Sequence, residues 1–187
     1  MKKTLLAVTA LAMLGSWTFL ARDFVRTSIY EGISVALPQS FQSMTEAQLQ
    51  ETYQAARRPL AAYSDPNRRT AFGLNVSNTR WQPGDLPMLK DFYRASLLEL
   101  YDEVTFLTEA VQEVNGQPFA VFEFVSVVRP ADDETSFIKQ KPIRRYTYVQ
   151  YTVHQQKTWV FDFSGPARDQ TTWQPVAQHM MESVRMK

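Results

Sequence analysis

The 187-residue chain has no cysteine, which excludes disulfide bonds, thiol catalysis, cysteine-ligated metals and a lipoprotein leader that ends in a lipidated cysteine. Its 20 basic and 19 acidic residues nearly cancel; without Lys2 and Lys3 the balance is 18 against 19, so the chain lacks the positive charge of proteins that bind nucleic acid or anionic lipid. The length suits one domain, and an aromatic content of 13% favours a sheet-rich core over disorder.

Residues 1–21 have the pattern of an export signal, because Lys2 and Lys3 precede an uncharged and mostly apolar run. A cleavage after Ala21 places Phe19 where a small residue is expected, and the run approaches the roughly 18 residues of a membrane-spanning helix. The segment is therefore predicted to be a cleaved signal peptide or an uncleaved signal anchor. Both alternatives place the rest of the chain across the inner membrane, as a periplasmic or secreted protein that touches the membrane only through its leader.

Residues 22–28 are predicted to form a short tether, and residues 29–187 a single domain. The domain opens with a strand over residues 29–37, in which apolar residues alternate with others until Pro38 ends the strand. No internal repeat or second domain is visible in the sequence.

Two helices are predicted in the first half of the domain. The run from Thr45 to Gln48 has the form of a capping box, in which the threonine hydroxyl and the glutamine amide satisfy backbone groups at a helix start, and Pro59 ends this helix. An alternating strand follows over residues 70–79. Asp85 caps the second helix. The apolar stripe of that helix consists of Leu86, Leu89, Tyr93, Leu97 and Leu100.

Four strands are predicted in the second half, over residues 105–114, 119–128, 143–154 and 159–163. Asn115-Gly116 is the strongest hairpin signal in the chain and joins the first two of them. The strand after this hairpin is apolar on both faces, so both of its faces are expected to be covered. A polar loop over residues 130–142 and a turn near Gln155 separate the other strands.

The last predicted element is a helix over residues 169–186, whose buried face includes Trp173, Val176 or Ala177, Met180 and Val184. Strands that are joined by tight turns are antiparallel, and a sheet buried on both faces needs helices on both sides. The predicted fold class is therefore α+β, an α/β/α sandwich with a largely antiparallel central sheet and helices on both faces, after an N-terminal leader helix.

Several segments, taken in order, resemble one known superfamily. They are YEGISVALPQSF from residue 30, FGLNVSN from residue 72, VQEVNGQPFAVFEF from residue 111, YTYVQYTV from residue 146 and KTWVFDFSG from residue 157. With the closing helix, this order resembles the PsbP-like superfamily, which also includes DcrB-like bacterial envelope proteins and a Ran-binding nuclear transport factor. The resemblance extends from residue 28 to the end. It implies a binding or assembly module without enzymatic activity, and it carries over no binding residue.

Candidate chemistry is sparse. His179 and Glu182 have the spacing of a metal-binding pair on a helix, but zinc usually takes at least three protein ligands and no HExxH motif is present. Ser164 lies outside a GxSxG frame, and the acidic run at residues 132–134 lacks the alternating ligands and the glycine of a calcium loop. The sequence therefore predicts no catalytic, cofactor-binding or metal-binding residue and no cofactor.

The strand that begins near Arg144 is rich in arginine and tyrosine. This composition resembles a face that binds single-stranded nucleic acid, but the nearly neutral charge of the chain favours a sheet face covered by a helix. Since tyrosine and arginine are also favoured at protein interfaces, the predicted partner-binding surface consists of Arg144, Tyr146 and Tyr148.

Two hypotheses of function stay open. The first is an exported, non-enzymatic envelope domain of PsbP/DcrB-like type that binds or helps to assemble a protein partner, as a tethered module if the leader is retained. The second is an exported small-ligand-binding protein or hydrolase with a site between sheet and helix. A pocket with convergent polar groups and a perturbed pKa favours the second hypothesis, and a filled core with an exposed apolar patch favours the first.

Overall fold

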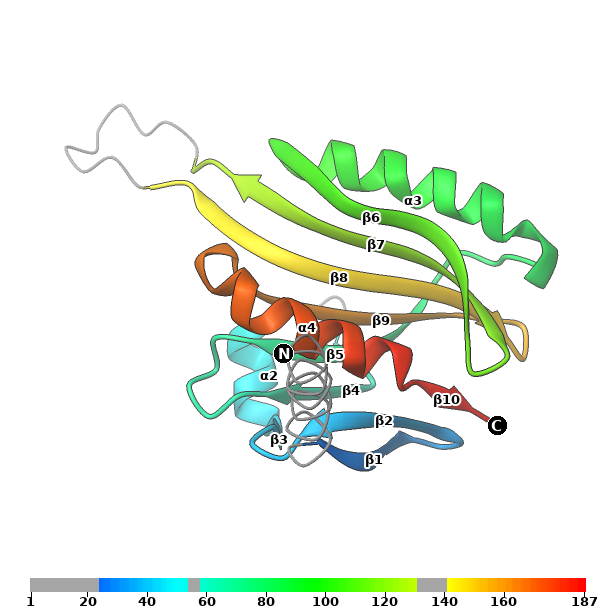
Figure 1. Cartoon of the computed structure of the whole chain (residues 1–187), viewed down its shortest axis with the longest axis horizontal. Coiled ribbons are helices and arrows are strands. Elements are labelled where there is room, and N and C mark those ends of the chain that lie inside the picture. The colour runs from blue at the N-terminus through cyan, green and yellow to red at the C-terminus, as the bar shows by residue number, and fades with distance from the viewer. Residues whose placement is uncertain (1–23, 54–57, 131–140) are drawn as a thin grey trace, which may run out of the picture.

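The computed structural model describes residues 24–53, 58–130 and 141–187 (Figure 1). The predicted leader, the acidic run at residues 132–134 and most of the predicted polar loop lie outside these ranges. Within them, no helix combines the length and the apolar character that are needed to cross a bilayer.

A seven-stranded sheet forms the centre of the molecule, and each of its neighbouring strand pairs is antiparallel. In spatial order the strands are β3 (Gln42–Ser43), β4 (Ala61–Ser64), β5 (Ala71–Ser77), β9 (Lys157–Pro166), β8 (Ile143–His154), β7 (Gln117–Val128) and β6 (Glu103–Val114). The antiparallel central sheet that the sequence predicts is confirmed. Two of its strands, β3 and β4, are additional to the prediction, because they are too short to show a clear alternation.

Two tight turns set the register of the long strands. Asn115 and Gly116 have φ values of 51° and 82°, and Gln155 and Gln156 have values of 49° and 62°. Left-handed backbone at both central residues is what a two-residue hairpin of type I′ requires. Both predicted turns are confirmed.

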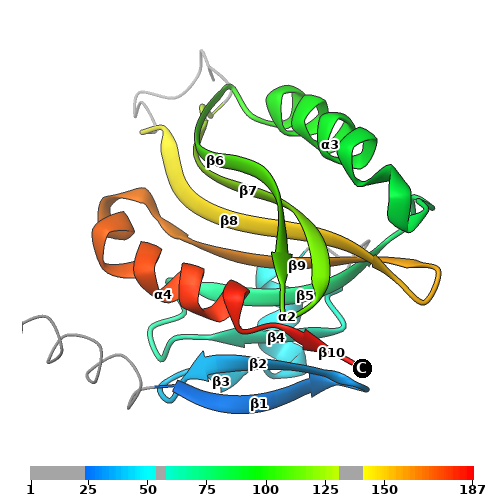
Figure 2. The same ribbon diagram turned by 45° about the vertical axis from the view of Figure 1, so that its right-hand side comes forward.

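The two faces of this sheet carry different helices (Figures 1 and 2). Helix α3 (Leu86–Leu100) packs on one face, where Leu89 joins Phe122 and Phe124 in one apolar cluster. Helix α4 (Gln170–Glu182) packs on the other face, where Met180 joins Phe161 in a second cluster. The predicted α/β/α sandwich is confirmed, including the burial of both faces of β7.

The predicted buried faces of the two helices are correct in most positions. Leu86, Leu89 and Leu97 of α3 are buried, but Leu100 is 68% exposed because it is the last residue of the helix, where the chain turns toward β6. The short helix α2 (Glu46–Thr52) starts at the predicted capping box, with the Thr45 hydroxyl and the Gln48 side chain both bonded to backbone N–H groups.

A second sheet, with three strands in the order β1-β2-β10, lies beside α4 (Figure 2). Three predictions from the sequence differ from the structure in this region. The predicted tether is wrong for residues 24–28, which belong to β1 (Phe24–Tyr30). The predicted strand over residues 29–37 is instead a hairpin of β1 and β2 (Ile33–Pro38), because Gly32 at φ 71° reverses the chain.

The closing helix is shorter than predicted, because the chain after Glu182 leaves the helix and forms β10 (Arg185–Met186). The Ser183 hydroxyl accepts a hydrogen bond from the backbone N–H of Ala36 in β2, and Lys187 N–H donates to the Gly32 carbonyl. These bonds direct the end of the chain into the small sheet.

Candidate binding groove

The predicted partner surface is mostly buried. Tyr146 and Tyr148 are 0% and 3% exposed, because alternation along β8 turns both side chains toward the face that α4 covers. Arg144 is exposed. The prediction is therefore wrong for the two tyrosines, which the surrounding side chains keep away from any partner.

The other candidates from the sequence have structural contacts. The His179 ring lies 4.3 Å from the Phe24 ring, centroid to centroid, and the Ser164 hydroxyl accepts a hydrogen bond from Arg145 at 2.9 Å. Among the residues that the structure describes, no group of three histidine, aspartate or glutamate side chains is arranged to hold a metal ion.

Glu123 of β7, which the sequence analysis missed, is a buried carboxylate with only 1% exposure. Its Oε1 accepts hydrogen bonds from the Tyr146 hydroxyl at 2.8 Å and from Gln174 at 2.7 Å, and its Oε2 accepts from Thr108 and Gln178, each at 3.2 Å. Neutral donors from two strands, β6 and β8, and from α4 thus satisfy both oxygens. The carboxylate joins α4 to the sheet and is not open to a ligand.

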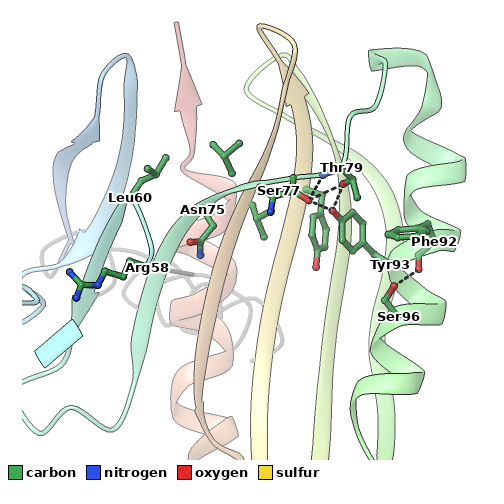
Figure 3. A pocket seen from close by; sticks show the side chains of 12 residues that line it. Arg58, Leu60, Asn75, Ser77, Thr79, Phe92, Tyr93 and Ser96 are labelled. Carbon is green, nitrogen blue, oxygen red and sulfur yellow. Dashed lines mark hydrogen bonds between the residues drawn. The ribbon is translucent and has the colours of Figure 1, made fainter. Parts of the chain in front are cut away.

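On the opposite face, a groove with a volume of about 660 Å³ lies between α3 and β5 (Figure 3). We call it the β5 groove. Its lining residues are Arg58, Leu60, Asn75, Val76, Ser77, Asn78, Thr79, Phe92, Tyr93, Ser96, Tyr151 and Val160. A second hollow of about 940 Å³ shares residues 76–79 with the groove and continues past Arg80 to Lys157. The two hollows together follow the last part of β5 and the segment after it.

The α3 wall of the β5 groove is held in place by hydrogen bonds and stacking. The Tyr93 hydroxyl lies 2.6 Å from Ser77 Oγ and 2.8 Å from Thr79 Oγ1, as Figure 3 shows. The Tyr93 ring stacks on the Tyr151 ring at 3.9 Å, and Trp81 donates to Thr79 Oγ1 at 3.0 Å. The groove is therefore formed before anything binds in it.

Asp162 of β9 lies next to the groove residue Asn75, which donates a hydrogen bond to its Oδ1 at 3.4 Å. A Cβ atom on Gly73 would lie 2.7 Å from the same oxygen, so the glycine leaves room for the carboxyl group. Burial raises the pKa of Asp162 to about 6, although the Asn75 hydrogen bond and the charge of Arg145 act in the opposite direction. A carboxyl group with a raised pKa thus lies beside the groove, in contact with Asn75.

The sequence contains a signal for both carboxylates that the analysis did not use. Glu123 and Asp162 are each a single acidic residue with apolar neighbours on both sides in a strand, in VFEFV and WVFDF. An acidic residue is seldom buried unless its environment compensates its charge, so such a position predicts a special environment.

The rim and the walls combine apolar and basic side chains. Leu60, Val76 and Phe92 are 46%, 37% and 45% exposed. Among the described residues, the charged ones that line the two hollows are Arg58, Arg80 and Lys157, and none of the lining residues is acidic. Arg58 is paired with Glu46. The groove can therefore contact apolar groups along its length and anionic groups near its ends.

The sequence matches no protein-family model, and no curated protein is similar to it in sequence. Three solved structures share the fold at low identity. Cyanobacterial PsbP (CyanoP) from Synechocystis sp. PCC 6803 is 13% identical, with a TM-score of 0.55 over 88% of this chain and 93% of that one. The Ran-binding protein Mog1p of Saccharomyces cerevisiae is 12% identical, with a TM-score of 0.55 over 87% and 95%. LpqN, involved in cell envelope biogenesis of Mycobacterium tuberculosis, is 11% identical, with a TM-score of 0.53 over 88% and 91%.

These likenesses show that the chain has the fold of the PsbP-like superfamily, so the resemblance seen in the sequence is confirmed for the fold. Structural similarity at such low identity carries no residue of a binding site from one protein to another. The function has to be argued from the groove itself.

Proposed function

We propose that this chain is an exported, non-enzymatic domain of the cell envelope that binds or helps to assemble a protein partner, and that the partner binds in the β5 groove. The observation that carries the proposal is the exposure of Leu60, Val76 and Phe92 along a preformed groove. Exposed apolar side chains that gather beside fixed polar groups are typical of protein interaction sites. The leader pattern of residues 1–21 supports export across the inner membrane, and this part of the proposal rests on that pattern alone.

The rigidity of the groove favours tight binding. Tyr93 is fixed by two hydrogen bonds and by stacking, so little side-chain entropy remains to be lost when a partner arrives. The centroids of the Phe92 and Trp81 rings lie 5.6 Å apart, and together the two rings form an aromatic surface at one side of the groove. Two of the proteins with this fold are a Ran-binding protein and a protein involved in cell envelope biogenesis, which is consistent with a binding role.

A small ligand is the second candidate for the same groove, and Asp162 is the observation in its favour. A partly buried carboxyl group with a raised pKa, next to the amide of Asn75, is typical of a polar anchor for a ligand that donates hydrogen bonds. If a small ligand is the natural occupant, Asp162→Asn abolishes its binding. If a protein is the occupant, contacts at the rim dominate, and the same substitution leaves most of the affinity.

Site-specific photocrosslinking in the host tests the protein-partner proposal. A photoreactive residue replaces Phe92 in the groove or, as a matched control, Val111 on β6; the two side chains are 45% and 44% exposed. We expect one discrete protein adduct from position 92 and none from position 111. Equal adducts from both positions, or none from position 92, would contradict the proposal. The intact mass of the protein from the envelope fraction shows in the same experiment whether residues 1–21 are retained.

A further inference from the structure

We infer that the edge of β5 at Val76 accepts an extended segment of the protein partner as an added strand, and that this segment carries acidic residues near its ends. The inference rests on the proposed function and specifies the partner's chemistry. Strand addition is a common mode of peptide recognition, in which backbone hydrogen bonds supply affinity and alternate side chains supply specificity.

The direction of the backbone groups along β5 is the first argument. Successive residues of a strand point their N–H and C=O groups to opposite edges. The carbonyls of Thr70 and Leu74 accept hydrogen bonds from the backbone N–H groups of Asp65 and Leu60 on the β4 side, and just past β5 the carbonyl of Thr79 accepts from the side-chain hydroxyl of Thr158 on the β9 side. The backbone N–H and C=O groups of the even-numbered residues of β5 therefore point toward the β4 side, and those of Val76 are among them.

The partner strand on this side stops before Val76. β4 begins at Ala61, which is in register with Leu74, and in the part of the chain that the structure describes no strand pairs with β5 beyond Leu74 on the β4 side. On the other side, β9 stays paired with β5 as far as Ser77. The last part of β5 is therefore paired along its β9 side, whereas its β4 side has no described partner strand.

The groove opens around this edge. Phe72 and Leu74 belong to the apolar cluster on the α4 face, so Val76 shares their face, whereas Asn75 and Ser77 point to the α3 face. Val76 from one face and Asn75 and Ser77 from the other all line the β5 groove, which indicates that the hollow reaches past the edge of the strand. The hollow thus lies next to the edge along which an added strand would pair.

The side chains around the edge specify the occupant. Leu60 and Phe92 lie on the two sides of the groove and suit apolar side chains of the added strand. Arg80 and Lys157 line the hollow at the far end, and in residues 24–53, 58–130 and 141–187 no acidic side chain lines either hollow, so charge complementarity favours an acidic segment. Short pairings of this kind already occur in the molecule, since β10 pairs with β2 through only two residues.

Amide hydrogen exchange measured by NMR on the full-length protein tests the inference. The probe is the synthetic peptide Asp-Val-Thr-Val-Thr-Val-Asp, and the control peptide has lysine in place of both aspartates. We expect the acidic peptide to slow exchange of the Val76 amide by roughly tenfold or more at saturation, with little change at Leu74, which already pairs with Ala61 of β4. The lysine peptide is expected to bind at least about tenfold more weakly.

A matched pair of variants separates the backbone contact from side-chain contacts. Val76→Pro removes the N–H group at the open edge, while Val76→Thr keeps it together with the branched side-chain shape. We expect Val76→Pro to weaken binding of the acidic peptide by about tenfold and Val76→Thr by less than about threefold. If Val76→Pro does not fold, the exchange measurement on the unmodified protein decides.

Binding of the acidic peptide without protection of Val76, equal binding of both peptides, or equal affinity of the two variants would each overturn strand addition. The failure of this inference differs from the failure of the proposed function. An adduct at position 92 without protection of Val76 leaves partner binding in place and removes the added strand. Protection of Val76 without an adduct keeps the strand site and removes the assigned role.

Discussion

Glu123 and Asp162 each interrupt an apolar strand, but their surroundings differ. Four neutral donors stabilise the Glu123 carboxylate; the Tyr146 hydroxyl is buried, and the other three donors are half-buried. Asp162 has one long hydrogen bond from Asn75, and burial raises its pKa to about 6. The first carboxylate therefore stabilises the fold, whereas the second one reduces stability when it is charged.

The pH dependence of stability is the test of this difference. The pKa of Asp162 is about 6 in the folded chain, against its usual value of 3.8, so the folded state holds the proton more tightly between these values. The free energy of unfolding therefore falls as the pH rises from about 4 to about 6. Asp162→Asn is expected to raise the free energy of unfolding by roughly 1 to 3 kcal/mol at pH 8 and to leave it nearly unchanged at pH 4. Urea unfolding at both pH values measures the effect.

Glu123→Gln is the control for this experiment, since it makes the same chemical change at the other carboxylate. We expect it to lower the free energy of unfolding by roughly 1 to 2 kcal/mol at pH 8, because one acceptor oxygen that faces hydrogen-bond donors is replaced by another donor. If both substitutions changed stability in the same direction at pH 8, the explanation of the Asp162 pKa would be wrong.

At the scale of elements, the β6–β7 hairpin also holds the end of α4. The Asn115 side chain donates to the carbonyls of Glu182 at 3.0 Å and Val184 at 2.8 Å. These carbonyls lie where α4 ends and the chain enters β10, so the turn residue satisfies groups that the helix leaves open. The residue that reverses one hairpin thus also fixes the path of the C-terminal segment.

Substitutions at Asn115 separate its two roles, because both glycine and aspartate tolerate the positive φ of this position. Asn115→Gly is expected to lower the free energy of unfolding by about 1 kcal/mol through loss of the two hydrogen bonds. Asn115→Asp is expected to lower it by about 2 kcal/mol, because a carboxylate then faces two carbonyl oxygens, and to recover part of the loss below pH 4, where the introduced carboxyl is protonated. Urea unfolding at pH 7 and pH 3.5 distinguishes the roles; identical losses for both variants at both pH values would exclude this capping contact.

At the scale of the whole molecule, the two faces of the seven-stranded sheet are packed against different elements. α3 covers one face over β6 and β7, and α4 together with the small sheet lies on the other, as Figures 1 and 2 show. The small sheet joins strands from both ends of the described chain, since β1 and β2 come from its start and β10 from its end. The two ends of the domain therefore stabilise each other.

A shortened chain tests this arrangement. Compared with a chain that begins at Phe24, one that begins at Ile29 loses the pairing of residues 24–28 with β2 and the contact of Phe24 with His179. We expect its free energy of unfolding to be lower by roughly 2 to 4 kcal/mol in urea titrations. Equal stability of the two chains would mean that residues 24–28 behave as the tether that the sequence predicts.

The sequence by itself determined the features that depend on residues close together in the chain. The capping box at Thr45, the turns at Asn115-Gly116 and at Gln155, the two amphipathic helices and the double burial of β7 each follow from a few neighbouring residues. Backbone conformation and side-chain periodicity are local properties, so spacing along the chain is enough to reveal them.

Only the tertiary structure decided which strands pair and which side chains stay exposed. β5 pairs with β9 from far along the chain, which places Asp162 beside the groove residue Asn75, while the pairing with β4 ends at Leu74 and leaves Val76 at an edge. In the same sheet the side chains of Tyr146 and Tyr148 are buried, although the arginine- and tyrosine-rich composition of their strand suggested an interface. The physical reason is that a strand has two faces and two edges, and what covers each of them is set by elements distant in sequence rather than by the strand's own residues.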